Sequence, residues 1–164
     1  MEMMGQYALP LLYALLGAAA LSDAASRRVP NALAVAIGML GIVYELQSDG
    51  IQAALLATGT GALVLVVLLL PWSRRMLGGG DVKLAAACAI WMGWERLPTF
   101  LLATALAGGL VAVTTAILAL RRTVALGVDK GAPPSGVARV RAAKVPYSVA
   151  IAAGAVVALH WRIP

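Results

Sequence analysis

Two aspartates in this 164-residue sequence occupy positions where a carboxylate needs an explanation. Asp81 follows three consecutive glycines, Gly78 to Gly80, at the start of an apolar stretch, and Asp23 directly follows another apolar stretch. Ionisable side chains at or near membrane depth are unfavourable and usually functional. Two neighbouring carboxylates do not both ionise readily, so one keeps a proton, as in aspartic proteases that activate water. The pattern indicates acid–base hydrolysis if the fold brings the two together.

The composition is that of a polytopic membrane protein. The chain is 62% hydrophobic and only 12% charged, which excludes an ordinary soluble domain. It has 13 Lys and Arg against 7 Asp and Glu, an excess that in a membrane protein reports loop orientation. No basic patch with interleaved aromatic residues supports nucleic-acid binding. The single cysteine, Cys88, excludes an internal disulfide and a Cys-based zinc cluster, and we expect it to be a packing residue.

The apolar pattern predicts an all-α bundle of about six transmembrane helices, at residues 4–22, 32–46, 52–71, 82–94, 97–120 and 145–162. The second and fourth stretches hold only about 13 to 15 strongly apolar residues, roughly 20 Å of helix against a hydrocarbon core of about 30 Å. We expect them to be short helices in a thinned bilayer, or partly re-entrant. Small residues such as Gly59-Thr60-Gly61 and Gly108-Gly109 predict close helix packing.

The charges predict an orientation. The first stretch is expected to be a retained helix and not a cleaved signal, because its amino-terminal flank carries Glu2 and no basic residue. Of the 13 basic residues, only Arg96 and Arg162 fall in the tails and even-numbered connections, and the other eleven fall in or at the edge of the odd-numbered ones. The positive-inside rule then places the N-terminus outside and the odd-numbered loops in the cytoplasm. Asp23 and Asp81 would share the cytoplasmic edge.

Residues 121–145 form the one long connection, which is basic and contains the turn-rich segment from Gly131 to Gly136. Its second half is either an ordinary cytoplasmic loop or a short basic amphipathic segment lying on membrane lipids. We expect residues 1–164 to form one integral membrane domain. The oligomeric state does not follow from the sequence.

The residues beside each aspartate have physical uses. Gly78 to Gly80 tolerate positive φ and, without Cβ atoms, let a substrate backbone approach Asp81 closely. The start of a helix at Asp81 favours its ionised form. Pro30-Asn31 is a suitable start for the second helix, just beyond Asp23. Spacing alone leaves open the alternative that both aspartates are interfacial caps and the glycines a loop.

Three motifs in order resemble those of the prepilin peptidase, or type IV leader peptidase, family. Gly78-Gly79-Gly80-Asp81-Val82-Lys83 is similar to the GxGD signature, and Asp23 followed by Arg28-Val29-Pro30-Asn31 is similar to the first aspartate motif. Residues 145–151, VPYSVAI, resemble a third segment, P-Y-G-x-A-I. The resemblance spans residues 20–154.

This resemblance implies an aspartic endopeptidase of the bacterial inner membrane. Its substrates would be prepilins or pseudopilins, whose N-terminal leader is removed at the cytoplasmic face without a metal or cofactor. Asp23 and Asp81 would be the catalytic pair. Gly78, Gly80, Lys83 and Asn31 would shape the site or contact the substrate.

Two departures qualify the resemblance. Longer, bifunctional members of the family carry a cytoplasmic segment with paired cysteines and also methylate the new N-terminus. Here the first cytoplasmic loop is short and Cys88 stands alone, which resembles the short branch associated with Flp or tight-adherence pili. We therefore do not expect N-methyltransferase activity. Ser148 replaces the usual glycine of the third motif, which puts a local helix contact in question. Two other classes remain open: a non-catalytic assembly subunit, and a small proton-coupled transporter whose acids would lie near the bilayer midplane.

Overall fold

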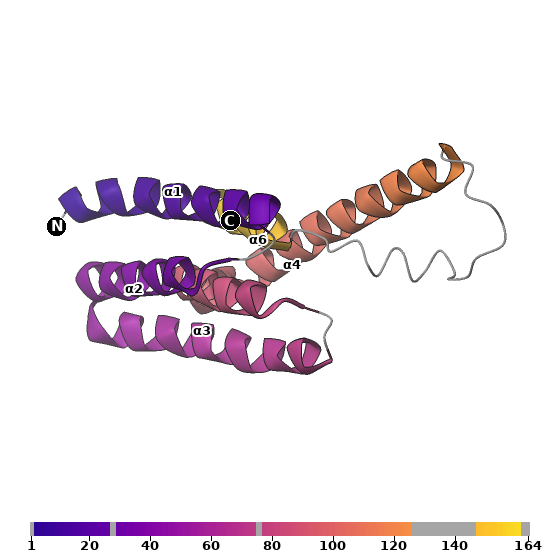
Figure 1. Ribbon diagram of the computed structural model, residues 1–164. Coiled ribbons are helices and arrows are strands. Elements are labelled where there is room, and N and C mark those ends of the chain that lie inside the picture. Colours follow the sequence, from indigo (N-terminus) through magenta and orange to yellow (C-terminus); the bar gives the residue numbers. More distant parts are fainter. Residues whose placement is uncertain (1, 27–28, 75–76, 126–146, 162–164) are drawn as a thin grey trace.

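The computed structural model describes residues 2–26, 29–74, 77–125 and 147–161. These residues form α1 (Glu2–Ser26), α2 (Asn31–Ser48), α3 (Gly50–Ser73), α4 (Gly79–Ala125) and α6 (Tyr147–His160). Figure 1 shows α1, α2 and α3 side by side, with the start of α4 and α6 packed among them. The predicted all-α fold is confirmed.

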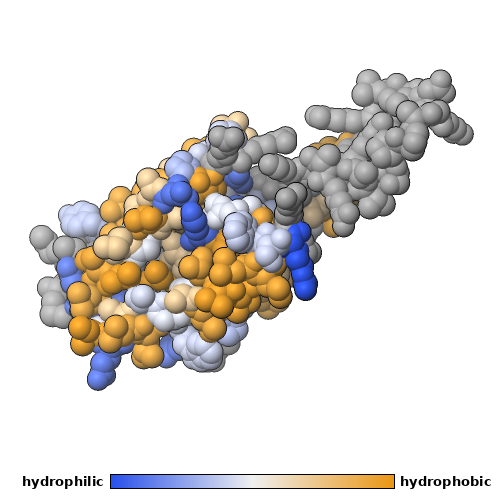
Figure 2. Space-filling view, turned by 60° about the horizontal axis from the view of Figure 1, so that its bottom comes forward, coloured by the Kyte–Doolittle hydropathy of each residue, from blue (hydrophilic) through white to orange (hydrophobic). Residues whose placement is uncertain are grey.

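Four of the described helices are long and apolar enough to cross a membrane, namely Tyr7–Ser26, Asn31–Ser48, Gly50–Ser73 and Gly79–Leu118, and α6 is a shorter apolar helix. Apolar side chains cover much of the face shown in Figure 2. The exposed apolar residues of the described helices include Leu55, Leu56, Val66 and Val67 of α3 and Leu102, Leu106 and Leu110 of α4. A bundle that presents leucine and valine outward is matched to lipid, so the chain is a polytopic membrane protein.

A backbone break at Gly93 divides α4 into two helical segments. Gly93 has φ 55° and ψ −168°, a conformation that residues with a Cβ atom rarely adopt. Residues 79–92 lie within the bundle, whereas the later part of α4 runs out beyond it (Figure 1). α4 thus contains both the fourth and the fifth predicted stretches, and the break lies close to the predicted boundary between them.

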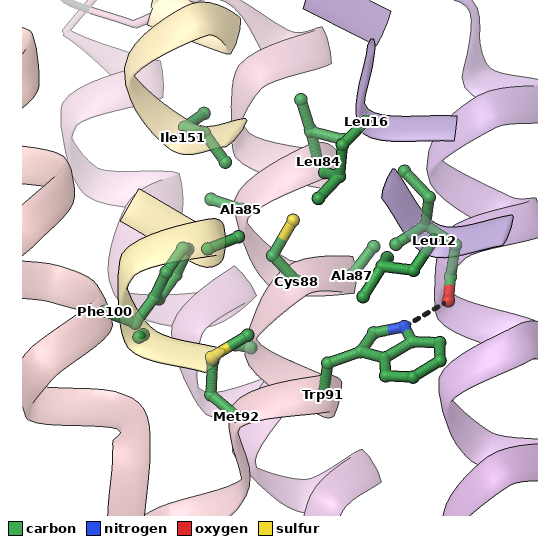
Figure 3. Close-up of a cluster of buried hydrophobic side chains, with 14 of the residues drawn as sticks. Leu12, Leu16, Leu84, Ala85, Ala87, Cys88, Trp91, Met92, Phe100 and Ile151 are labelled. Carbon is green, nitrogen blue, oxygen red and sulfur yellow. Dashed lines mark hydrogen bonds between the residues drawn. The ribbon is translucent and has the colours of Figure 1, made fainter. Parts of the chain in front are cut away.

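The first segment of α4 is the centre of the packing. α4 contacts α2, α3 and α6, and α1 contacts α2 and α6. In Figure 3, Leu84, Cys88 and Trp91 of α4 lie among side chains from α1 and α6. The Trp91 indole N–H donates a hydrogen bond of 2.9 Å to the carbonyl oxygen of Ile37 in α2. Cys88 is buried and free, as predicted for a packing residue.

Small residues allow the helices to approach closely. A Cβ atom at Gly61 would lie 2.5 Å from Ile90 Cγ1 and 2.9 Å from the carbonyl oxygen of Ala86, so α3 meets α4 at a position that only glycine permits. The predicted role is confirmed for Gly61. It is wrong for Gly59 and Gly109, where an added Cβ atom would meet nothing within 4 Å.

Several predicted boundaries differ from the observed ones. The first helix continues to Ser26, so Asp23 lies inside α1 and not after it. The second helix has 18 residues, about 27 Å of helix, which is longer than the predicted length of roughly 20 Å and close to the thickness of the hydrocarbon core. Residues 121–125 belong to α4, and the rest of the long connection lies outside the described residues.

Candidate active site

Asp23 lies in the last turns of α1 and is only 8% exposed. Its Oδ2 atom accepts a hydrogen bond of 2.7 Å from the hydroxyl of Ser148 at the start of α6. A carboxylate cannot cap the C-terminal end of a helix, because it and the free carbonyl groups are both acceptors. The interfacial-cap alternative is therefore wrong for Asp23, which is a buried side chain that bonds across the bundle.

Asp81 lies in the first turn of α4, as predicted. Its carboxylate accepts a hydrogen bond from the backbone N–H of Gly78, the residue that precedes the helix. This is one half of a capping box, so the cap alternative holds in part for Asp81. The cap leaves one oxygen unused, however: Oδ1 is buried and has no hydrogen-bond partner within the described residues. Such an atom is uncommon in a folded protein and marks a functional candidate.

The glycines before Asp81 are required for space and not for an unusual backbone. Positive φ occurs at Gly50 and Gly93 among the described residues, so Gly78 to Gly80 do not use the positive φ that glycine tolerates. A Cβ atom at Gly78 would lie 2.8 Å from Asp81 Oδ2, and one at Gly80 would lie 3.1 Å from Val29 Cβ. Gly78 thus makes room for the carboxylate, and Gly80 lets α4 approach the connection that follows α1.

The two aspartates meet at one end of the bundle although 58 positions separate them. The charge of Asp23 acts on the Asp81 carboxyl, so the two groups lie within electrostatic range. Among the described residues no Cα atom of α1 lies within 8 Å of one of α4. The backbones therefore stand apart at this point, while the two carboxyl groups are within electrostatic range of each other. Two carboxyl groups within this range can divide acid and base roles.

Lys83 and Asn31 lie on the exposed side of the same end. Lys83 Nζ donates a hydrogen bond of 3.0 Å to Asn31 Oδ1, which joins the first turns of α4 and α2. α2 begins at Asn31 directly after Pro30, as predicted. The contact gives both side chains a structural role, and their assignment to substrate contact stays a prediction.

Ser148 was missed as a site residue. In the sequence it stands out only as a departure from the third motif, whereas the structure places it, fully buried, against Asp23. One signal was available. A serine at the start of a very apolar helix, at the end of the bundle predicted to carry Asp23, needs a partner when it is buried. Arg28 and the first two residues of the third motif lie outside the described residues.

Comparison with known proteins decides the family. The model of the type IV leader peptidase family matches residues 10–113, which include Asp23, Asn31, Gly78, Gly80, Asp81 and Lys83. The chain belongs to this family. No solved structure matches.

Curated relatives are named prepilin leader peptidase/N-methyltransferase. The chain is 32% identical over 108 residues to the prepilin leader peptidase/N-methyltransferase of Escherichia coli K12, covering 62% of this chain and 48% of that protein. It is 31% identical over 104 residues to the protein of the same name in Dickeya chrysanthemi, covering 60% and 37% respectively. It is 33% identical over 98 residues to the protein of the same name in Klebsiella pneumoniae, covering 56% of this chain and 43% of that protein. The chain therefore spans about a third to a half of the length of the curated relatives it matches.

Proposed function

We propose that this bacterial membrane protein is an aspartic endopeptidase that removes the N-terminal leader of prepilins or pseudopilins. The observation that carries the proposal is the pairing of Asp23 and Asp81, which come from two helices and lie within electrostatic range. The match to the type IV leader peptidase family spans both aspartates and their neighbours. One carboxylate takes a proton from water while the other carboxyl group donates to the scissile carbonyl.

The chemistry is assigned to the cytoplasmic face of the inner membrane. The orientation rests on the positive-inside distribution of the basic residues, with the N-terminus outside. Exposed Arg74 and Lys83 lie near the ends of α3 and α4 that flank Asp81, and the acidic Glu45, Asp49 and Glu95 lie near the other helix ends. The substrate's apolar helix would dock laterally from the membrane, and its extended cleavage site would reach the aspartates.

The proposed activity is the peptidase step alone. The relatives are named for an N-methyltransferase activity as well, but only part of their length is matched. Here the connection between α1 and α2 is short, and Cys88 is buried within α4. Neither feature supports a cysteine-rich cytoplasmic segment.

The transporter alternative is not favoured by the positions of the acids. A proton relay would require acids near the bilayer midplane. Asp23 lies in the last turns of α1 and Asp81 in the first turn of α4, so both are close to helix ends. The alternative of a non-catalytic assembly subunit predicts no leader cleavage, which the following experiment measures.

The test is leader removal in cells. The protein is co-expressed with a prepilin from its own genome, and the shorter product is followed by gel shift. Asp23→Asn and Asp81→Asn are each expected to lower cleavage at least about a hundredfold, the usual contribution of a general acid or base. Asp49→Asn, which changes an exposed acid between α2 and α3, is the matched control and should cleave normally. Unchanged cleavage by either site variant, inserted at wild-type level, would refute the proposal.

A further inference from the structure

Ser148 contacts one of the two aspartates from a third helix. Its hydroxyl donates to Asp23 Oδ2 over 2.7 Å, although the two residues are 125 positions apart. Ser148 is fully buried, and Asp23 nearly so. Bulk water therefore does not compete for this bond, and the bond fixes the rotamer of the Asp23 carboxylate relative to α6.

The bond also suits the role of a base. The Ser148 hydroxyl donates to one carboxylate oxygen of Asp23 and leaves the other oxygen able to accept a proton from water.

Asp81 presents the complementary arrangement. The backbone N–H of Gly78 bonds to its carboxyl group, but Oδ1 is buried without a partner in the described part of the chain. A charged oxygen that is buried without a hydrogen-bond partner is unfavourable, whereas a protonated oxygen is an O–H donor that needs only an acceptor. The carbonyl oxygen of a bound peptide would be that acceptor.

We propose that Ser148 is a positioning residue that holds the Asp23 carboxylate in place as the base of the pair, with Asp81 as the proton donor. The inference rests on the proposed peptidase function. Asp23 takes a proton from water as the water oxygen bonds to the scissile carbon, and Asp81 gives its proton to the carbonyl oxygen. The C–N bond of the adduct then breaks, the proton on Asp23 passes to the leaving nitrogen, and a hydroxyl proton of the adduct returns to Asp81.

The test compares two substitutions that separate the hydroxyl from its volume. Ser148→Ala removes only the hydroxyl, while Ser148→Thr keeps it and adds a methyl group in a fully buried position. If Ser148 acts through its hydrogen bond, the alanine variant loses about tenfold or more in kcat, the threonine variant retains more activity than alanine, and KM changes little. If Ser148 only fills space, the alanine variant keeps the wild-type kcat, because alanine removes the hydroxyl without overpacking the site. A wild-type kcat of the alanine variant would overturn the inference.

A matched control removes another buried hydroxyl. Thr60 is also buried, but its hydroxyl donates to the carbonyl oxygen of Leu56 in its own helix, 2.9 Å away. Thr60→Val keeps the shape and deletes this bond, so its kcat should stay at the wild-type value. An equal loss of kcat in Thr60→Val would mean that any buried hydroxyl matters, and would overturn the specific role of Ser148.

A stability measurement separates this inference from the function itself. Thermal unfolding of the purified protein in detergent is compared for Ser148→Ala, Asp23→Ala and the double variant. A direct bond predicts non-additive shifts of Tm, since either single change already removes the contact. Additive shifts would overturn the inference whatever the activity. Non-additive shifts with a wild-type protein that cleaves no prepilin would instead refute the proposed function and, with it, the catalytic role of the contact.

Discussion

At Gly78 the absence of a side chain leaves space for one oxygen of Asp81. A Cβ atom there would lie 2.8 Å from Asp81 Oδ2, which is closer than van der Waals contact allows. The obstructed group is the end of a flexible side chain and not backbone. The carboxylate can therefore move away at little loss of stability, but it then leaves the position beside Gly78 that it has in the structure.

Gly78→Ala should consequently reduce activity without unfolding the protein. We expect leader cleavage to fall about tenfold to a hundredfold, since small displacements of a catalytic group have effects of that size, with Tm almost unchanged. Gly109→Ala is the control, because a Cβ atom at Gly109 meets nothing within 4 Å. A Gly78→Ala variant with wild-type cleavage would show that the glycine is not needed by the site.

Single residues also show how far the sequence alone could predict the site. The pairing of Asp23 with Asp81 follows from charge and topology, because helices that alternate in direction bring these two acids to one end. The glycines were singled out for their tolerance of positive φ and for their missing Cβ atoms, and the space left by the missing Cβ atom is what Gly78 provides beside Asp81. Ser148 was missed because a hydrogen bond between side chains 125 positions apart leaves no periodic signal in the sequence.

Among the helices, α4 depends most on close contact with its neighbours. Gly61 of α3 faces Ile90 and the backbone of Ala86, and lipid provides no hydrophobic drive to bring the helices together. The contact is therefore maintained by packing alone. A side chain added at Gly61 would separate α3 from the helix that carries Asp81.

Gly61→Ala is expected to lower the free energy of unfolding by about 1 to 3 kcal/mol, the typical effect of overpacking. Gly59→Ala is a matched control two positions away, where a Cβ atom meets nothing within 4 Å. It should leave stability unchanged or raise it by about 0.5 to 1 kcal/mol, because alanine favours the helix over glycine. Denaturant or thermal unfolding in detergent measures both. Equal effects of the two substitutions would contradict the described packing of α3 on α4.

Hydropathy predicted the existence of these helices better than their ends. Apolar stretches report which residues avoid water, so they underestimated α1, whose last turns include polar residues such as Ser22 and Asp23. For the same reason the burial of Asp23 was not predicted, because hydropathy places a carboxylate at the end of an apolar helix and does not reveal its hydrogen bond with Ser148. The position of the break in α4 was nearly found, since glycine and charged residues cluster from Gly93 to Arg96.

For the molecule as a whole, the proposed function requires both aspartates at the cytoplasmic surface. The basic residues predict this orientation, and it can be tested independently of any substrate. In a Cys88→Ala background, Arg74→Cys and Asp49→Cys place single thiols in the connections at opposite ends of α3. A membrane-impermeant thiol reagent should label Asp49→Cys in intact cells and Arg74→Cys only after lysis. The reverse pattern would put the aspartates on the other side of the membrane.

The proposed chemistry depends above all on Asp23 and Asp81 acting as one unit, and the decisive experiment is single-turnover cleavage of a purified prepilin by excess purified protein. The predicted result is a product cut at the leader junction, a rate lowered at least about a hundredfold by Asp23→Asn and by Asp81→Asn, and no further loss in the double variant, as for residues that work together. Wild-type rates in either single variant, or losses that multiply in the double variant, would show that the two carboxyl groups do not form a catalytic pair.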